Sequence, residues 1–210
     1  MKKFLFLLLI VPFMLCACKV SDPKIGQARA VVLFDYETGG YPQVRLCAFV
    51  SLLSEYNRFK ELVVKNKKEK LVWNITNPLF ISDSRVVWCG STSIYGGGGL
   101  GIPAGDYEVT YTDLADRTAK YYCKVEYPSE LAGIGYGSLF SSEYLKNLDE
   151  YLVLFSDKKE IIYLGKKDES PFETNDAILE KYPSTAAKRK LFTKNNLTYA
   201  VLLPVETVKK

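Results

Sequence analysis

Apolar and polar residues alternate along much of this chain, and the alternation predicts a protein made mainly of β-strands. The clearest case is residues 106–112 and 120–127, two alternating runs separated by the polar turn 113–117. Their apolar positions are Tyr107, Val109 and Tyr111 in the first run and Tyr121, Cys123, Val125 and Tyr127 in the second. Because successive side chains of a strand point to opposite faces, each run places these residues on one face. The pair therefore predicts a β-hairpin.

Other short apolar runs, bounded by turn residues, predict further strands. These runs are residues 28–35, 44–53, 62–65, 70–76, 85–91, 151–155, 161–164 and 197–203. In the run 44–53, Cys47 lies on the face opposite the alternating apolar residues, beside Arg45 and Phe49. Residues 51–64 also fit the spacing of a short helix, but we expect a loop that leads into the strand at 62–65.

Composition agrees with this pattern, because fifteen tyrosines and eleven phenylalanines suit a pleated, half-buried surface. Short strands at turn-bounded intervals predict a β-sandwich, which we place at residues 27–128. After residue 128 the pattern changes, and short helices are expected at 141–148 and 175–182. Residues 129–210 either extend the sandwich or form a smaller C-terminal unit of α+β or β structure; we favour the smaller unit.

Residues 103–113 (Pro-Ala-Gly-Asp-Tyr-Glu-Val-Thr-Tyr-Thr-Asp), followed by a turn and a second aromatic strand, resemble the late hairpin of immunoglobulin-like and fibronectin type III-like β-sandwiches. The resemblance is to such domains in exported bacterial proteins, and it implies an Ig-like sandwich. The chain departs from antibody-type domains in one respect. Trp73 lies 26 residues after Cys47, farther than in that pattern, so we infer no Cys47–Cys123 disulfide.

The N-terminus carries a signal for export. Lys2 and Lys3 form a basic start, and the uncharged run 4–17 follows, with the small residue Ala17 just before Cys18. A positive start, a short apolar core and a small residue before the cleavage site are typical of a secretory signal peptide. The run is shorter than the ~20 residues that a transmembrane helix needs.

The end of that run, Leu15-Cys16-Ala17-Cys18, resembles the lipobox of bacterial lipoproteins. The resemblance implies removal of residues 1–17, diacylation of the Cys18 thiol and acylation of the new amino terminus, with palmitate as an expected chain. Residues 18–26 would then be a short tether to the membrane. In lipoproteins of double-membraned bacteria, Asp after the lipidated Cys favours the inner membrane, so Lys19 is compatible with the outer membrane. Exposure to the periplasm or to the outside stays open.

Charge and histidine content narrow the classes of function. Loss of residues 1–17 removes Lys2 and Lys3 and no acid, which changes the net charge from +4 to about +2. That charge is too small for a nucleic-acid binder. The chain contains no His, which excludes Ser-His-Asp and Cys-His hydrolases and His-based zinc sites. Chemistry by carboxylates alone survives, but we assign no catalytic residue, metal ligand or cofactor.

Three cysteines would remain in the processed chain after Cys16 is removed and Cys18 is lipidated. They are Cys47, Cys89 and Cys123, and no CxxC spacing links them. An exported protein meets an oxidising compartment, so one disulfide and one free thiol are compatible with the sequence. Three buried free thiols are equally compatible.

Four groups of residues are candidate sites, and each also has an ordinary structural explanation. They are the acids Asp106, Glu108, Asp113 and Asp116, the aromatic residues Trp73, Trp88, Tyr95 and Tyr136, the lysines 65, 67, 68 and 70, and the glycines 96–99. The acids suggest a calcium site or a glycosidase pair, the aromatic residues a sugar platform, the lysines an anionic envelope surface and the glycines a phosphate loop. In each case we prefer the structural explanation. The glycines lack the Gly-Lys-Ser/Thr ending of a P-loop, and 133–137 lacks the dinucleotide fingerprint.

Three functions remain in order of preference. The first is a lipid-anchored envelope lipoprotein that acts as a non-enzymatic binding or structural module, with an envelope or extracellular protein as partner. The second is a carboxylate-dependent hydrolase of envelope glycans, and the third is a carrier of a small apolar ligand. The sequence does not identify ligand-binding residues.

Overall fold

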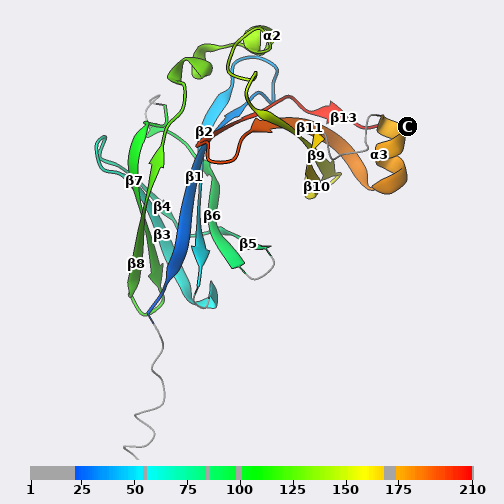
Figure 1. Ribbon diagram of the computed structural model, residues 1–210. Helices are drawn as coiled ribbons and strands as arrows, with labels where there is room; N and C mark the ends of the chain where they lie inside the picture. Colours follow the sequence, from blue (N-terminus) through cyan, green and yellow to red (C-terminus); the bar gives the residue numbers. More distant parts are fainter. Residues whose placement is uncertain (1–21, 54–55, 84–85, 98–100, 168–173, 210) are drawn as a thin grey trace, which may run out of the picture.

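The computed structural model describes residues 22–53, 56–83, 86–97, 101–167 and 174–209, which form a mainly β fold of two packed sheets (Figure 1). The expected fold class is thus confirmed as mainly β, with a sandwich of two sheets as its main body. No helix in the described ranges is long and apolar enough to cross a bilayer. The residues of the proposed lipobox, 15–18, lie outside these ranges.

Within the described residues, one sheet contains nine strands and the other four. The strands of the larger sheet are β1 (Ile25–Asp35), β2 (Gln43–Leu52), β5 (Leu79–Asp83), β6 (Val86–Ile94), β9 (Asp149–Ser156), β10 (Ile161–Lys166), β11 (Thr185–Thr193), β12 (Tyr199–Leu202) and β13 (Glu206–Thr207). Those of the smaller sheet are β3 (Phe59–Asn66), β4 (Leu71–Ile75), β7 (Gly105–Asp113) and β8 (Thr118–Val125). The helical elements are η1 (Tyr56–Arg58), η3 (Ser129–Gly133), α2 (Tyr136–Leu139) and α3 (Asn175–Lys181).

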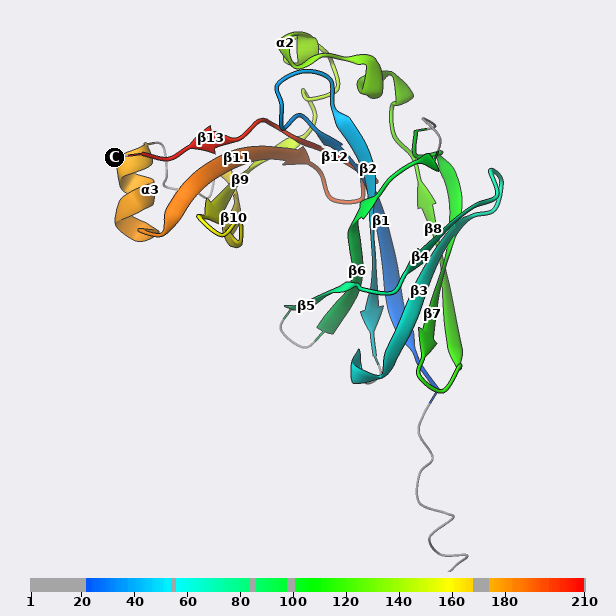
Figure 2. The ribbon, with the colours of Figure 1, turned by 180° about the vertical axis from the view of Figure 1, so that it is seen from behind.

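Strand order explains the outline of the molecule. The larger sheet runs β10-β9-β11-β12-β1-β2-β6-β5, with β13 beside β11, and the smaller runs β4-β3-β7-β8. β12 pairs with β1 in parallel and only over residues 32–35 of β1. Through this short pairing, the larger sheet continues beyond the sandwich as β11, β9 and β10. Figures 1 and 2 show this extension from opposite sides, with α3 at its far end. Residues 129–210 therefore add strands to a sheet that begins in the N-terminal half.

The core lies between the two sheets and is filled by the alternating residues of the sequence pattern. Phe34, Leu46, Leu62, Tyr107 and Tyr111 are fully buried there. The predicted hairpin is formed by β7 and β8, which pair with Tyr107 opposite Cys123. Gly90 allows β6 to approach β2 closely, because a Cβ at this position would lie 2.1 Å from the carbonyl oxygen of Ala48.

One end of the sandwich is covered by residues 129–148, which lie across it as short helical turns (Figure 1). Leu131, Leu139 and Leu145 are buried in the core, and the hydroxyl of Tyr36 donates to the carbonyl of Ile134 at 2.9 Å. The helix expected at 141–148 is wrong: these residues form separate turns. A helix of eight residues has only marginal stability by itself. The burial of Leu145 in the core fixes the path of this segment instead.

Three strands of the structure, β5, β11 and the short β13, were absent from the sequence prediction. β5 has five residues without alternation, and its Leu79, Phe80 and Ile81 are all largely exposed. β11 contains a basic run that lacks apolar alternation, yet it is the central strand of the C-terminal part of the sheet. The other predicted strands are found, with ends shifted by a few residues, and α3 begins as expected after its N-cap Thr174. The loop expected within 51–64 is shorter than predicted, because β2 runs to Leu52, η1 is Tyr56–Arg58 and β3 already begins at Phe59 instead of at residue 62.

A buried ionic cluster joins the C-terminal strands to the sandwich. The carboxylate of Asp35, at the end of β1, pairs with Arg45 of β2 at 2.9 Å and with Arg189 of β11. Asp35 and Arg189 are both buried. The Arg45 guanidinium also donates to the carbonyl of Thr92, and the Arg189 guanidinium donates to that of Leu203. One carboxylate thus connects three strands from both halves of the chain.

Replacement of Asp35 by Asn should lower the free energy of unfolding by about 3 kcal/mol, because it leaves two guanidinium groups without their carboxylate in a desolvated site. Urea unfolding of the non-lipidated Cys18→Ser protein measures this loss. Glu37→Gln is the matched control, because the Glu37 side chain is exposed. Equal stability of the Asp35→Asn and Glu37→Gln proteins would show that the cluster does not stabilise the fold.

Candidate functional site

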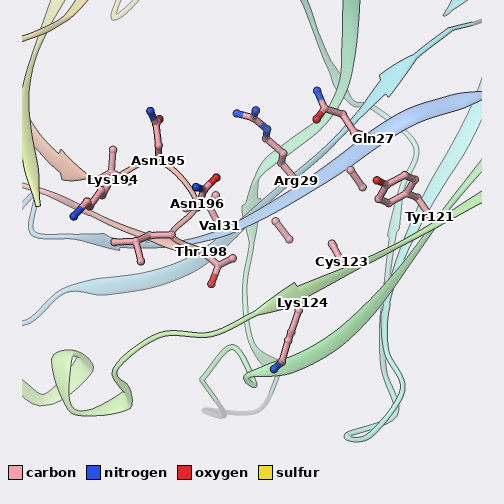
Figure 3. Close-up of a pocket in the computed structure, with 14 residues that line it drawn as sticks. Gln27, Arg29, Val31, Tyr121, Cys123, Lys124, Lys194, Asn195, Asn196 and Thr198 are labelled. Atoms are coloured by element: carbon pink, nitrogen blue, oxygen red, sulfur yellow. The ribbon is translucent and has the colours of Figure 1, made fainter.

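A groove with a volume of about 760 Å³ lies beside the first part of β1, which β12 does not pair with. Its walls come from three separate segments: 27–31 of β1, 121–124 of β8 and 193–198, the connection from β11 to β12 (Figure 3). This volume is in the range of sites that hold ligands. The groove is the candidate functional site of the described residues.

The groove exposes an unpaired strand edge. β1 pairs with β12 only from Val32 onward, where the Val32 amide donates to the carbonyl of Thr198 at 2.8 Å. Because every second residue of a strand directs its backbone groups to the same edge, Ala28 and Ala30 direct theirs toward the groove. Apart from β2 on the opposite edge, no described strand pairs with this stretch of β1, and none pairs with the outer edge of β8. The backbone of β1 can therefore bond an added extended segment.

The side chains around this edge are small at the base and polar at the rim. Ala28, Ala30 and Cys123 leave space, while the rim offers the amides and hydroxyls of Gln27, Tyr121, Asn195, Asn196 and Thr198. In Figure 3, Gln27 and Arg29 on β1 and Asn195 on the connection point to the same side of the groove. The arrangement can donate and accept several hydrogen bonds to one extended ligand.

The charge of the lining residues has one sign. Arg29, Lys124 and Lys194 line the groove, and no Asp or Glu does. Lys124 pairs with Glu126 just outside it, so Arg29 and Lys194 supply most of the positive charge. The Arg29 guanidinium lies 5.5 Å from the centre of the Trp88 ring on β6, a cation–π contact. The groove therefore favours an anionic ligand.

The connection that closes the groove is fixed to the smaller sheet. The Thr198 hydroxyl accepts from the Glu126 amide at 2.7 Å and donates to the Glu126 carbonyl. Asn196 has a positive φ of 72°, a conformation that Asn adopts more readily than most residues. These contacts hold Lys194 and Asn195 beside β1, so the groove wall is preorganised.

The candidate acids serve the structure, and they do not converge on one site. Asp113 is buried and accepts from the amides of Ala115 and Arg117, which closes the turn between β7 and β8. Asp116 pairs with Lys60 on β3. The Arg117 guanidinium beside Asp113 holds the pKa of that carboxyl below its usual range. A general acid of a glycosidase needs a raised pKa, so Asp113 is unsuited to that role.

Glu108 is the most strongly perturbed acid. Its carboxylate accepts from Lys67 at 3.0 Å and Lys120 at 3.1 Å, and these hydrogen bonds lower its pKa to about 2. The Lys67 ammonium also lies 4.7 Å from the ring centre of Tyr122. Glu108 thus stays ionised, with both of its partners on neighbouring strands or turns of the smaller sheet.

Glu108 should make stability depend on pH in the acid range. Because its pKa is lower in the folded protein, its contribution is complete above the usual glutamate pKa and is lost as pH falls toward about 2. Glu108→Gln should therefore cost about 1 kcal/mol of unfolding free energy at neutral pH and almost nothing near pH 2. Urea unfolding across this range tests the point, with the exposed Glu130→Gln as control. A pH-independent difference between the two variants would contradict the assignment.

The aromatic candidates do not form one platform. The Trp73 indole N–H donates to the carbonyl of Tyr95 at 2.8 Å, and its ring stacks on Tyr107 in the smaller sheet. Trp88 lies on β6 of the other sheet under Arg29, and Tyr136 packs on Tyr36 at the covered end. The structure brings Trp73 and Tyr95 together and leaves the others apart.

The lysine candidates surround the hairpin between β3 and β4. Lys67 pairs with Glu108, Lys68 lies 3.8 Å from Glu69, and Lys70 occupies the turn with a positive φ of 56°. This hairpin lies at the end of the sandwich opposite the start of β1 (Figure 1). The glycine candidates 98–99 lie outside the described residues, whereas Gly97 is within them.

All three cysteines in the described residues are free thiols. Cys89 is buried, and Cys47 is half-buried with its Sγ 3.8 Å from the carbonyl oxygen of Thr92. Burial raises the pKa of Cys89 to about 12 and that of Cys47 and Cys123 to about 11. Because the thiolate is the reactive form, these thiols are protected. No group of three or more potential metal ligands is present in the described part of the chain.

The thiols should be inert in the folded protein. Near pH 8, Ellman's reagent should label none of Cys47, Cys89 and Cys123 until guanidinium unfolds the chain, and should then label all three. A Cys18→Ser protein that lacks residues 1–17, purified without reductant, keeps Cys16 and Cys18 out of the measurement. Fewer than three reactive thiols after unfolding would reveal a disulfide.

Sequence reasoning did not identify the groove. Arg29, Tyr121 and Asn195 are far apart in the chain, and each has an ordinary strand or turn pattern around it. The signal that the sequence does contain is the basic stretch 188–196, which ends in the polar Lys194-Asn195-Asn196 turn. Its position beside β1 follows from the parallel pairing of β12, which no local pattern reveals.

Three comparisons with known proteins were made, and none gives a relative. No family model, no curated protein and no solved structure matches the chain. The functional argument therefore rests on the lipobox resemblance and on the geometry of the groove.

Proposed function

We propose that this protein is a lipid-anchored lipoprotein of the bacterial cell envelope that binds an acidic, extended segment of a partner protein in the groove between β1 and β8. The observation that carries the proposal is the groove itself, an unpaired strand edge lined by cations and amides with no carboxylate among its lining residues. Addition of a strand to a free sheet edge is a common mode of peptide recognition. The cations then select acidic side chains and speed association.

The anchor supports the same function. The lipobox resemblance at Leu15-Cys16-Ala17-Cys18 implies acyl chains on Cys18, and several chains together give stable membrane attachment. Lys19 is compatible with the outer membrane. A binding module held at the envelope meets a partner that is exposed there. We further propose that the sandwich belongs to the Ig-like class, whose members use edges and loops for recognition.

The proposal assigns no enzymatic activity. Glu108 and Asp113 are held ionised by basic partners, which does not suit the protonated acid of a glycan hydrolase. The space between the sheets is filled by Phe34, Tyr107 and Tyr111, which does not favour an apolar carrier. Binding of an extended segment in the preorganised groove requires neither a protonated catalytic acid nor an apolar cavity between the sheets.

A photo-crosslinking residue at position 195 in the membrane-anchored protein tests the proposal in cells. The unmodified groove should capture one envelope protein. Lys194→Glu should reduce capture about fivefold, because it places a negative charge where the ligand is acidic. Lys158→Glu is the matched control, since it makes the same charge change in the exposed turn between β9 and β10. Equal capture by both variants would contradict the site.

The same strains test the anchor and the class of ligand. Labelled palmitate should enter the unmodified protein, and Cys18→Ser should abolish the labelling. Recovery of glycan in place of a protein would contradict a polypeptide ligand. Palmitate labelling that persists in Cys18→Ser would contradict the assigned lipid site.

A further inference from the structure

We infer that the end of the sandwich where β1 begins rests on the lipid surface and contacts it through Leu53, Tyr56 and Leu114. The inference depends on the proposed anchor at Cys18, and it adds a protein face that enters the membrane interface.

Three segments converge at this end. The amide of Leu53, just after β2, donates to the carbonyl of Lys24 at 2.9 Å, and the amide of Leu114, in the turn after β7, donates to the carbonyl of Arg58 at 2.8 Å. Tyr56 lies in η1 between these contacts in the chain. The β2–β3 and β7–β8 connections, to which these three residues belong, therefore lie at the same end of the sandwich as the start of β1 (Figure 2).

These side chains are unusually exposed for their type. Leu53 is 66% exposed, Leu114 is 65% exposed and Tyr56 is 50% exposed. Phe80 packs against Tyr56, with ring centres 5.8 Å apart, and it is 43% exposed itself. Leucine and tyrosine at the tips of loops suit the boundary between headgroups and acyl chains, where the tyrosine ring meets both environments.

The tether brings this end to the membrane. Asp22 follows Cys18 by four positions, and a fully extended chain over four Cα–Cα steps spans about 14 Å. Asp22 lies 3.6 Å from the Arg117 guanidinium in the turn that carries Leu114, which fixes the start of the described chain at this end. β1 has 11 residues and a length of about 36 Å, so the opposite end, with the lysine hairpin, lies beyond this reach.

Charge at this end is nearly balanced. Lys60 pairs with Asp116, and Arg117 pairs with Asp113 as well as Asp22. A cationic surface would bind anionic lipid in a salt-dependent way. Here the apolar tips carry the contact, so we expect it to persist at high salt and in membranes of different headgroup charge.

The test uses an environment-sensitive dye on Leu114→Cys in the lipidated protein, reconstituted into phosphatidylethanolamine–phosphatidylglycerol vesicles with or without doxyl-labelled lipid. The native thiols are protected by burial. Emission at position 114 should rise about threefold over the non-lipidated Cys18→Ser protein in buffer and should be quenched by doxyl lipid. The dye on Tyr41→Cys is the control, because Tyr41 is 70% exposed at the covered end. Its emission should not change.

Each outcome decides a different point. A dye at position 114 that is not quenched, on protein that floats with the vesicles, would overturn the inference and leave the anchor intact. Protein that carries no lipid at Cys18 and does not float would reject the anchor. Emission that rises with protein density but is not quenched by doxyl lipid would show contact with a second copy, and would also overturn the inference. Addition of Leu53→Ser should reduce quenching at position 114 if both tips share the lipid surface.

Discussion

The fold depends on one buried carboxylate, that of Asp35. Asp35 ends β1 and holds the guanidinium groups of Arg45 and Arg189, so it joins the first two strands of the chain to β11 near its end. Buried ion pairs add little net stability relative to apolar packing, but loss of one partner is costly. We expect this cluster to favour the observed placement of β11, in which all three charges are paired.

That placement determines the candidate site. With β11 fixed, β12 pairs with β1 only over residues 32–35, and the connection 193–198 comes to lie beside the free part of β1. The Thr198 contacts to Glu126 then join the connection to the smaller sheet. The groove exists because the parallel pairing of β1 with β12 stops after four residues. The same pairing places Lys194 beside β1, where it adds positive charge to the groove.

The two ends and the flank of the sandwich have different surfaces. The end at the start of β1 has exposed apolar tips, the opposite end is covered by residues 129–148, and the groove opens on the flank between them. Burial raises the pKa of the Cys89 thiol, and the lysine partners of Glu108 lower the pKa of its carboxyl. These features agree with a protein that is held at a membrane and recognises a partner through shape, hydrogen bonds and charge.

The sequence by itself determined the elements whose cause is local. Alternation at Tyr107, Val109 and Tyr111 predicts a buried strand face because strand side chains alternate strictly, and the N-terminal run predicts export because its length and charge are read linearly. The tertiary structure alone decided what depends on distant neighbours. β11 is a strand because β9 and β12 bond its backbone on both edges, residues 141–148 form turns because the open end of the core needs single leucines, and the groove combines three segments whose proximity no local pattern encodes.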